Sequence, residues 1–274
     1  GELSASDTSL DLNGLITLNN QSGATYRNAK LQLVAGDVNR VSDEFASAKT
    51  LGRAVAAPQP VSNEALLEYH LYSVSRPTTI ADKQSKQIAL LSANQIAVTK
   101  SLELRGEASY YTSRSSDLGD RLKFSVFIQF RNDGGGLGIP LPKGTVRIYK
   151  KDSHGNAQFV GEDSIDHTPR HELVRLRLGE SFDVTANRKQ TNYRYYRDGA
   201  DYIYETSIDL DLHNAKDQAQ TVKIVEPMPG INWRIVSENY HHTKGSADTA
   251  LWNITVPANG KTTLSYTVEV RMPV

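Results

Sequence analysis

Residues 122–130, which read Leu-Lys-Phe-Ser-Val-Phe-Ile-Gln-Phe, decide the fold class of this chain. Every second residue in this stretch is apolar. Successive side chains of a strand point to opposite faces of a sheet, so the pattern predicts a strand buried on one face. The predicted buried face consists of Leu122, Phe124, Val126, Ile128 and Phe130.

The same alternation recurs on both sides of this stretch. Before it, alternating runs cover 10–18, 31–34, 67–73, 88–91 and 96–104. After it, residues 146–149 and 158–160 flank the turn 152–156 and predict a hairpin. Further runs cover 202–212, 221–225, 233–236, 251–256 and 262–270. No long helical pattern interrupts them, so the sequence predicts an all-β fold.

The spacing of these runs predicts two β-sandwich units. We place one boundary near Gly179, which gives a β-sandwich-like N-terminal domain of residues 1–179 and a C-terminal domain of residues 180–274. The short, regular strand intervals of the second domain are typical of an immunoglobulin-like sandwich. Residues 42–64 lose the alternation and contain Pro58-Gln59-Pro60, so a long loop is predicted near 42–64.

The composition excludes several classes of function. The 31 Lys and Arg residues balance 31 Asp and Glu residues, so no overall basic field favours nucleic-acid binding. The chain has no cysteine, which excludes disulfides, thiolate metal sites and cysteine nucleophiles. No apolar run approaches the ~20 residues of a membrane span, so no transmembrane segment is expected.

Several segments in order along the chain carry a resemblance to a known family. They are Tyr26–Leu31, Val34–Arg40, Tyr69–Pro77, Leu137–Gly144, Gly161–Asp163, His167–Pro169, the strand at Trp233, and Tyr266–Val270. In this order the sequence resembles the bacterial exported family called domain of unknown function 4139, which also forms the C-terminal part of proteins named mucoidy inhibitor A. The resemblance implies an exported, periplasmic, β-rich protein, and it supplies no catalytic residue.

Histidines are the first candidates for metal ligands in a chain without cysteine. His167 and His171 lie four residues apart, but Pro169 between them blocks the helix that would bring both rings to one face. His241 and His242 are adjacent, and neighbouring strand residues point in opposite directions, so we expect them to be solvated rather than to share a metal. The sequence therefore predicts no metal site.

Other motifs are weaker candidates for catalysis or cofactor binding. The glycine-rich stretch 132–138 lacks the Gly-Lys-Ser/Thr ending of a phosphate-binding loop and is interpreted as a flexible connection. Asp209 and Asp211 alternate with apolar residues, which is typical of the outer face of a strand. No Gly-x-Ser-x-Gly motif is present. We therefore predict no catalytic residue and no cofactor.

The best candidate for a binding surface is an aromatic hairpin. Tyrosines 193, 195, 196, 202 and 204 surround Arg194, Arg197 and the turn 198–201. Amphipathic rings next to guanidinium groups suit a protein or glycan partner. The predicted surface consists of Tyr193, Tyr195, Tyr202, Tyr204 and Arg194. The alternative is that these rings are half-buried where the two domains meet.

These observations favour a non-catalytic structural or interaction module of the bacterial cell envelope. Its expected location is the periplasm or another exported site, and its expected partner is an envelope protein or a glycan. The alternative is an envelope hydrolase or carbohydrate-active enzyme whose site is assembled from distant strands, because spacing along the sequence does not exclude such a site.

Overall fold

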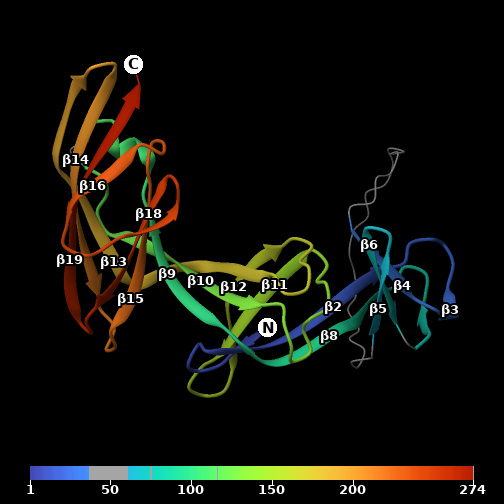
Figure 1. Ribbon diagram of the computed structural model, residues 1–274. Helices are drawn as coiled ribbons and strands as arrows, with labels where there is room; N and C mark the ends of the chain where they lie inside the picture. Colours follow the sequence, from blue (N-terminus) through green and yellow to red (C-terminus); the bar gives the residue numbers. More distant parts are fainter. Residues whose placement is uncertain (37–60, 75, 116, 274) are drawn as a thin grey trace. The chain divides into compact units, whose positions relative to one another are not determined.

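The computed structural model describes residues 1–36, 61–74, 76–115 and 117–273 (Figure 1). Within these ranges the secondary structure is almost all strand, with one short 3-10 helix, η1 (Ala108–Tyr111). Each alternating run of the sequence overlaps a strand. The predicted all-β fold class is confirmed.

The chain divides into two compact units, and neither is one continuous segment. The first contains Gly1–Thr99 and Ile128–Leu176, and the second contains Lys100–Phe127 and Arg177–Val274. The chain passes from the first unit to the second between residues 176 and 177, close to the predicted boundary at Gly179. Residues 100–127, which were expected in the N-terminal domain, belong to the second unit. The reason is the pairing of β9 (Thr99–Arg105), which is parallel to β15 (Gln220–Pro227). Pairing between such distant strands leaves no mark in local periodicity.

The main sheet of the first unit has the strand order β12-β11-β1-β2-β8. These strands are β1 (Glu2–Leu3), β2 (Ser9–Asn19), β8 (Ser85–Ala97), β11 (Gly144–Lys151) and β12 (Ala157–Ile165). The predicted hairpin is the pair β11–β12. Its turn is held by the Asp152 carboxylate, which accepts hydrogen bonds at 2.9 Å from the backbone N–H groups of His154 and Asn156.

Two smaller sheets complete the described part of the first unit. One has the order β4-β6-β5, and the other pairs β3 with β7. The strands are β3 (Tyr26–Ala29), β4 (Gln32–Ala35), β5 (Val61–Leu66), β6 (Tyr69–Val74) and β7 (Thr78–Ile80). Most of the loop predicted near 42–64 lies outside the described residues, but its end, residues 61–64, is part of β5. Residues 62–65 are exposed and polar or small, so this edge strand lacks the alternation that would predict it.

The large sheet has the order β16-β19-β14-β13-β10-β9-β15-β18-β17. The strands not yet given are β10 (Leu122–Arg131), β13 (Leu173–Asp198), β14 (Asp201–Asn214), β16 (Trp233–Glu238), β17 (Thr243–Ser246), β18 (Thr249–Val256) and β19 (Gly260–Pro273). In the second unit the two ends of this strand order face each other across one core, to which β13, β14 and β19 contribute from one side and β9, β15 and β18 from the other. Trp252 and Tyr266 stack there with ring centroids 4.6 Å apart.

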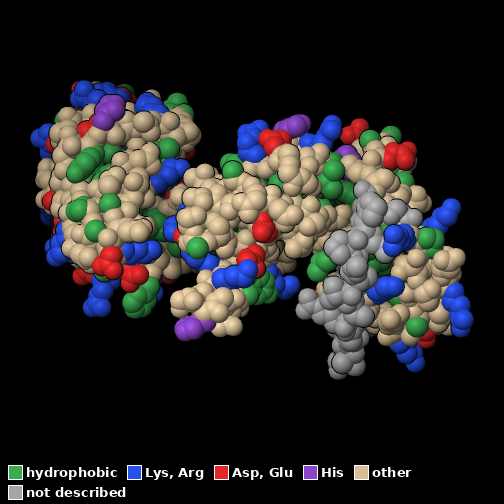
Figure 2. Space-filling model, turned by 90° about the horizontal axis from the view of Figure 1, so that it is seen from below, with side chains coloured by type: hydrophobic (Ala, Val, Ile, Leu, Met, Phe, Trp, Pro, Cys, Tyr) green, Lys and Arg blue, Asp and Glu red, His purple; other side chains and the backbone are tan. Residues whose placement is uncertain are grey.

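This sandwich explains why the alternation in β14 and β19 is so regular. In β14 Ile208, Leu210 and Leu212 are fully buried, whereas the residues between them are only half-buried. Phe124 and Ile128 of β10 are also fully buried, as the opening stretch of sequence predicts. Over the second unit, Figure 2 shows basic and acidic side chains interspersed on the surface.

Candidate functional site

The hairpin β13–β14 brings the four predicted tyrosines together. Tyr195 lies directly opposite Tyr204 in the antiparallel register, so Tyr193, Tyr195, Tyr202 and Tyr204 share one face. Their ring centroids form a continuous row with successive separations of 6.4, 6.1 and 6.5 Å, in the order 193, 195, 204, 202. We call these four residues the tyrosine row.

The tyrosine row packs against the core through Tyr204 and is exposed to solvent at Tyr195. Tyr204 packs against the core, and the Tyr193 hydroxyl donates a hydrogen bond of 2.9 Å to the carbonyl of Thr112. Burial raises the pKa of Tyr193, and Tyr204 adds to the shift. Tyr195 is 62% exposed. All these contacts lie within the second unit, so they do not support the alternative of a domain junction.

Arg194 lies on the opposite face of the hairpin from the tyrosine row. It forms a two-pronged ion pair with Glu205, at 3.0 and 2.6 Å, and its guanidinium group lies over the Tyr196 ring. The prediction that Arg194 shares one surface with the four tyrosines is therefore wrong. The reason is the alternation of the strand itself, which sends residues 193 and 195 to one face and 194 and 196 to the other.

The two histidines His167 and His171 contact different residues, and the glycine-rich stretch 132–138 is held by local hydrogen bonds. His167 Nδ1 accepts a hydrogen bond from the Lys143 backbone, whereas His171 Nδ1 contacts Asp133. The glycine-rich stretch is organised by the buried Asn132 side chain, which binds the carbonyls of Ile139 and Pro169 at 2.7 and 3.0 Å.

Asp209 and Asp211 are part of the regular surface of strand β14. They alternate with the buried residues of β14, on its outer face, as the sequence predicts. Asp211 accepts a hydrogen bond of 2.7 Å from the Thr263 hydroxyl of the neighbouring strand.

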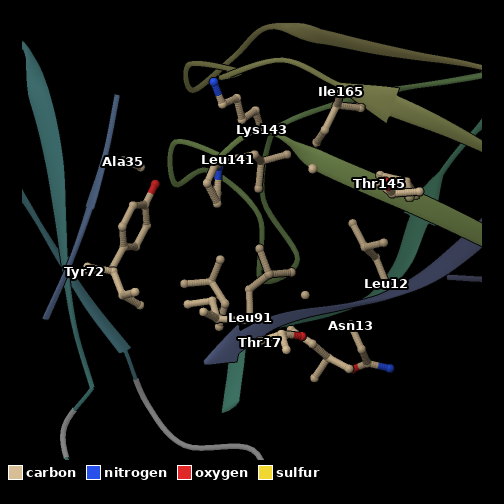
Figure 3. Close-up of a pocket in the computed structure, with 18 of the residues that line it drawn as sticks. Leu12, Asn13, Thr17, Ala35, Tyr72, Leu91, Leu141, Lys143, Thr145 and Ile165 are labelled. Atoms are coloured by element: carbon tan, nitrogen blue, oxygen red, sulfur yellow. The ribbon is translucent and has the colours of Figure 1, made fainter. Parts of the chain in front are cut away.

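A cavity of about 670 Å³ lies within the first unit. Figure 3 shows Tyr72 on one side of it and Leu91 and Leu141 across from this ring. The Tyr72 hydroxyl donates a hydrogen bond to Pro140, and burial raises the pKa of Tyr72 to about 12. His167 contributes a buried Nε2 that lacks a hydrogen-bond partner. This arrangement can hold an apolar group that also offers one acceptor.

The strands that line this cavity are distant in sequence, so no local pattern predicts it. Among the described lining residues, Lys143, Arg147 and His167 supply basic groups, and none is a carboxylate. Arg147 is already paired with Glu162 at 2.8 Å. The lining therefore offers basic and apolar groups.

The interior of the second unit contains a buried network of charged and phenolic groups. Arg188 and Glu226 form an ion pair at 2.5 Å and are 1% and 0% exposed. The Tyr111 hydroxyl lies 2.8 Å from Glu226 Oε2 and 2.8 Å from the Tyr266 hydroxyl. Burial raises the pKa of Glu226, an effect that Arg188 opposes.

This network is closed rather than open to a substrate. Gly106 lies directly against the glutamate, since a Cβ at Gly106 would come within 1.9 Å of Glu226 Oε2. The side chains of Arg188, Glu226 and Tyr111 are almost completely excluded from solvent. Their arrangement, with Tyr266, therefore joins β13, β15 and β19 to the η1 segment and stabilises the packing of the core.

A second cluster consists of Glu238, His241 and His242, and it brings the two adjacent histidines to one carboxylate, which the strand alternation did not predict. One ring nitrogen of each histidine and a Glu238 carboxylate oxygen all lie within 4.8 Å of one another. Residues 239–242 form the turn between β16 and β17, where strand alternation does not hold. The motif Glu-x-x-His-His in a predicted turn is the sequence signal that could have indicated this cluster.

Glu238 is fixed by more than the histidines. The Trp252 indole N–H donates a hydrogen bond of 3.0 Å to Glu238 Oε2. Burial raises the pKa of the Glu238 carboxyl, but hydrogen bonds from His242 and Trp252 outweigh burial, so the pKa lies below its usual value. The carboxyl group is therefore held as a carboxylate.

Comparisons with known proteins add no relative. No family model, curated protein or solved structure matches the chain. The described part of the chain also contains no helix with the length and apolar character needed to cross a membrane.

Proposed function

We propose that this protein is a non-catalytic interaction module of the bacterial cell envelope, and that the tyrosine row of its second unit binds a protein partner. The observation that carries the proposal is the exposed Tyr195 ring, which stacks on Tyr204 at 6.1 Å within a row of four rings. The second unit is proposed to be an immunoglobulin-like sandwich, a fold that commonly serves recognition.

The composition of the tyrosine row favours a protein partner. The centres of protein interfaces are enriched in tyrosine and depleted of charge, whereas arginine is common near them. The row itself is uncharged, and Arg197 follows it on the same face at the hairpin tip. Tyr193 is held by its hydrogen bond to Thr112, and Tyr204 is held by packing against the core. These rings therefore lose little side-chain freedom on binding.

A non-catalytic role is supported by the positions of the strongest acid–base groups. Glu226 and Arg188 neutralise each other in the interior, and the Tyr111 hydroxyl donates a further hydrogen bond to Glu226. The resemblance to the exported family and the absence of cysteine support a periplasmic or other exported location. Fractionation of cells of the source organism, with detection of the protein by antibody, tests this location.

Site-specific cross-linking tests the binding surface. We expect a photoreactive phenylalanine analogue at position 195 to cross-link one defined envelope protein in living cells, and a second substitution, Tyr204→Ala, to weaken that cross-link. The matched control is position 182, because Phe182 is 87% exposed and lies on the same strand, outside the row. Equal cross-linking from both positions, or a glycan as the only species captured at 195, contradicts the proposal.

A further inference from the structure

We propose that Glu238, His241 and His242 form a binding site for a divalent transition-metal ion of the zinc, nickel and copper class. The inference is independent of the tyrosine row. Two imidazole nitrogens and one carboxylate oxygen are a ligand set that suits these metals rather than magnesium or calcium.

The distances within the cluster match a shared ion. Glu238 Oε1 lies 3.1 Å from His241 Nδ1 and 3.0 Å from His242 Nδ1. Metal bonds of ~2.0–2.2 Å at tetrahedral angles place two ligand atoms roughly 3.3–3.6 Å apart. The two glutamate–histidine separations are therefore already close to those that a shared ion needs, and rotation of the exposed His241 ring can adjust the position of its nitrogen.

The backbone around the cluster is anchored by the neighbouring strand. Asn239, the first residue of the turn, donates to the Thr263 carbonyl at 2.8 Å and accepts from the Ser265 N–H at 2.8 Å. A third hydrogen bond, of 3.1 Å, joins the Asn239 N–H to the Ser265 carbonyl. These bonds fix the turn on β19 while the chain passes from β16, which pairs with β19, to β17, which pairs with β18.

Two of the three ligands are oriented from outside the cluster. Trp252 donates to Glu238 Oε2 and also, at 3.0 Å, to the Tyr240 carbonyl. The His242 ring lies between Trp233 and Trp252, with both centroid separations 5.8 Å. Groups that orient metal ligands in this way raise affinity, since their removal commonly costs about 10-fold to 100-fold.

The third ligand leaves the site open to solvent. The His241 side chain is 89% exposed, whereas those of His242 and Glu238 are only 19% and 15% exposed. Three protein ligands leave at least one position for water or for a group of a bound partner. Lys244 lies over the Trp233 ring at 4.7 Å and is a nearby positive charge that opposes metal binding.

In the absence of metal the same atoms are joined by hydrogen bonds. Each Nδ1–H can donate to Glu238. Before Nδ1 can bind an ion, the proton of a neutral ring must move to Nε2, and a ring protonated on both nitrogens must lose one proton. Zinc affinity should therefore fall in acid, where the rings are protonated on both nitrogens, whereas a cluster joined only by hydrogen bonds binds no zinc at any pH. This difference separates a metal site from an ion pair.

Calorimetric titration of the full chain, prepared without a histidine tag and stripped with EDTA, tests the site. With zinc chloride at about pH 7 we expect binding of one ion per chain, and weaker binding at about pH 5.5, where protons compete for imidazole nitrogens. His241→Ala should weaken zinc binding by about 10-fold or more. Because this side chain is exposed, the melting temperature of the metal-free variant should stay unchanged.

Controls and a second variant make the result decisive. His154→Ala removes an exposed histidine of the first unit and should leave zinc affinity unchanged. Glu238→Gln should also weaken binding, and magnesium chloride should give no saturable heat. Absence of saturable zinc binding, or equal zinc affinity of wild type and His241→Ala, overturns the proposal.

Discussion

The second unit contains two arginine–glutamate pairs of similar geometry in opposite environments. Arg188 and Glu226 are 2.5 Å apart, and their side chains are 1% and 0% exposed. Arg194 and Glu205 are 2.6 Å apart, and their side chains are 60% and 15% exposed. The separation is nearly the same, but water screens one pair and is excluded from the other. Burial, rather than contact distance, therefore decides what each pair contributes to stability.

The largest expected effect is the loss of one partner of the buried pair. Glu226→Ala leaves the Arg188 charge in the core without a counter-charge, and we expect a loss of about 3–5 kcal/mol in the free energy of unfolding, measured by urea denaturation. The double variant Arg188→Met, Glu226→Leu should recover most of this loss because no charge stays buried. If Glu226→Ala lowers the free energy of unfolding by less than about 1 kcal/mol, water reaches the Arg188 guanidinium group in the variant.

A smaller effect is expected for Glu238 and His242, whose side chains are intermediate in exposure. The folded-state pKa of Glu238 is below the ordinary value of 4.5. A group with a lowered folded-state pKa stabilises the fold at pH values above its ordinary pKa. This stabilisation is lost as the pH falls through the folded-state pKa. His242, which donates to the carboxylate, favours this charged form.

The measurement is a comparison of wild type with Glu238→Gln in metal-free buffer. Between about pH 7 and about pH 3, the melting temperature of wild type should fall more steeply than that of the variant, by an amount corresponding to about 1 kcal/mol or less. Parallel curves for the two proteins would contradict the lowered pKa.

The smallest effect is expected at the exposed pair. Arg194→Ala removes a guanidinium group that water already solvates, so the denaturation midpoint should not change measurably at physiological salt. Arg234→Ala is the matched control, since Arg234 forms the same kind of pair with Glu269 at 2.8 Å and is also exposed. A clear loss for Arg194→Ala alone would indicate that its contact with Tyr196 stabilises the hairpin.

The candidate sites differ in how much of them could be predicted. The tyrosine row follows from two alternating runs joined by a Gly199 turn, so the grouping of Tyr193, Tyr195, Tyr202 and Tyr204 was predictable. The same alternation should have placed Arg194 on the other face. The Glu238 cluster was missed because the strand rule was applied to His241 and His242, which lie in a turn.

The amino-acid sequence by itself determined that the chain is built of strands, and in strands such as β10 and β14 it also determined which side chains are buried. Both properties follow from the two-residue repeat of a pleated strand, which is local. Only the tertiary structure decided that Tyr111 meets Glu226, 115 residues away, and that residues 100–127 belong to the second unit. These contacts depend on the order and register of strands in the sheet, which are set by the packing of the whole core rather than by neighbouring residues.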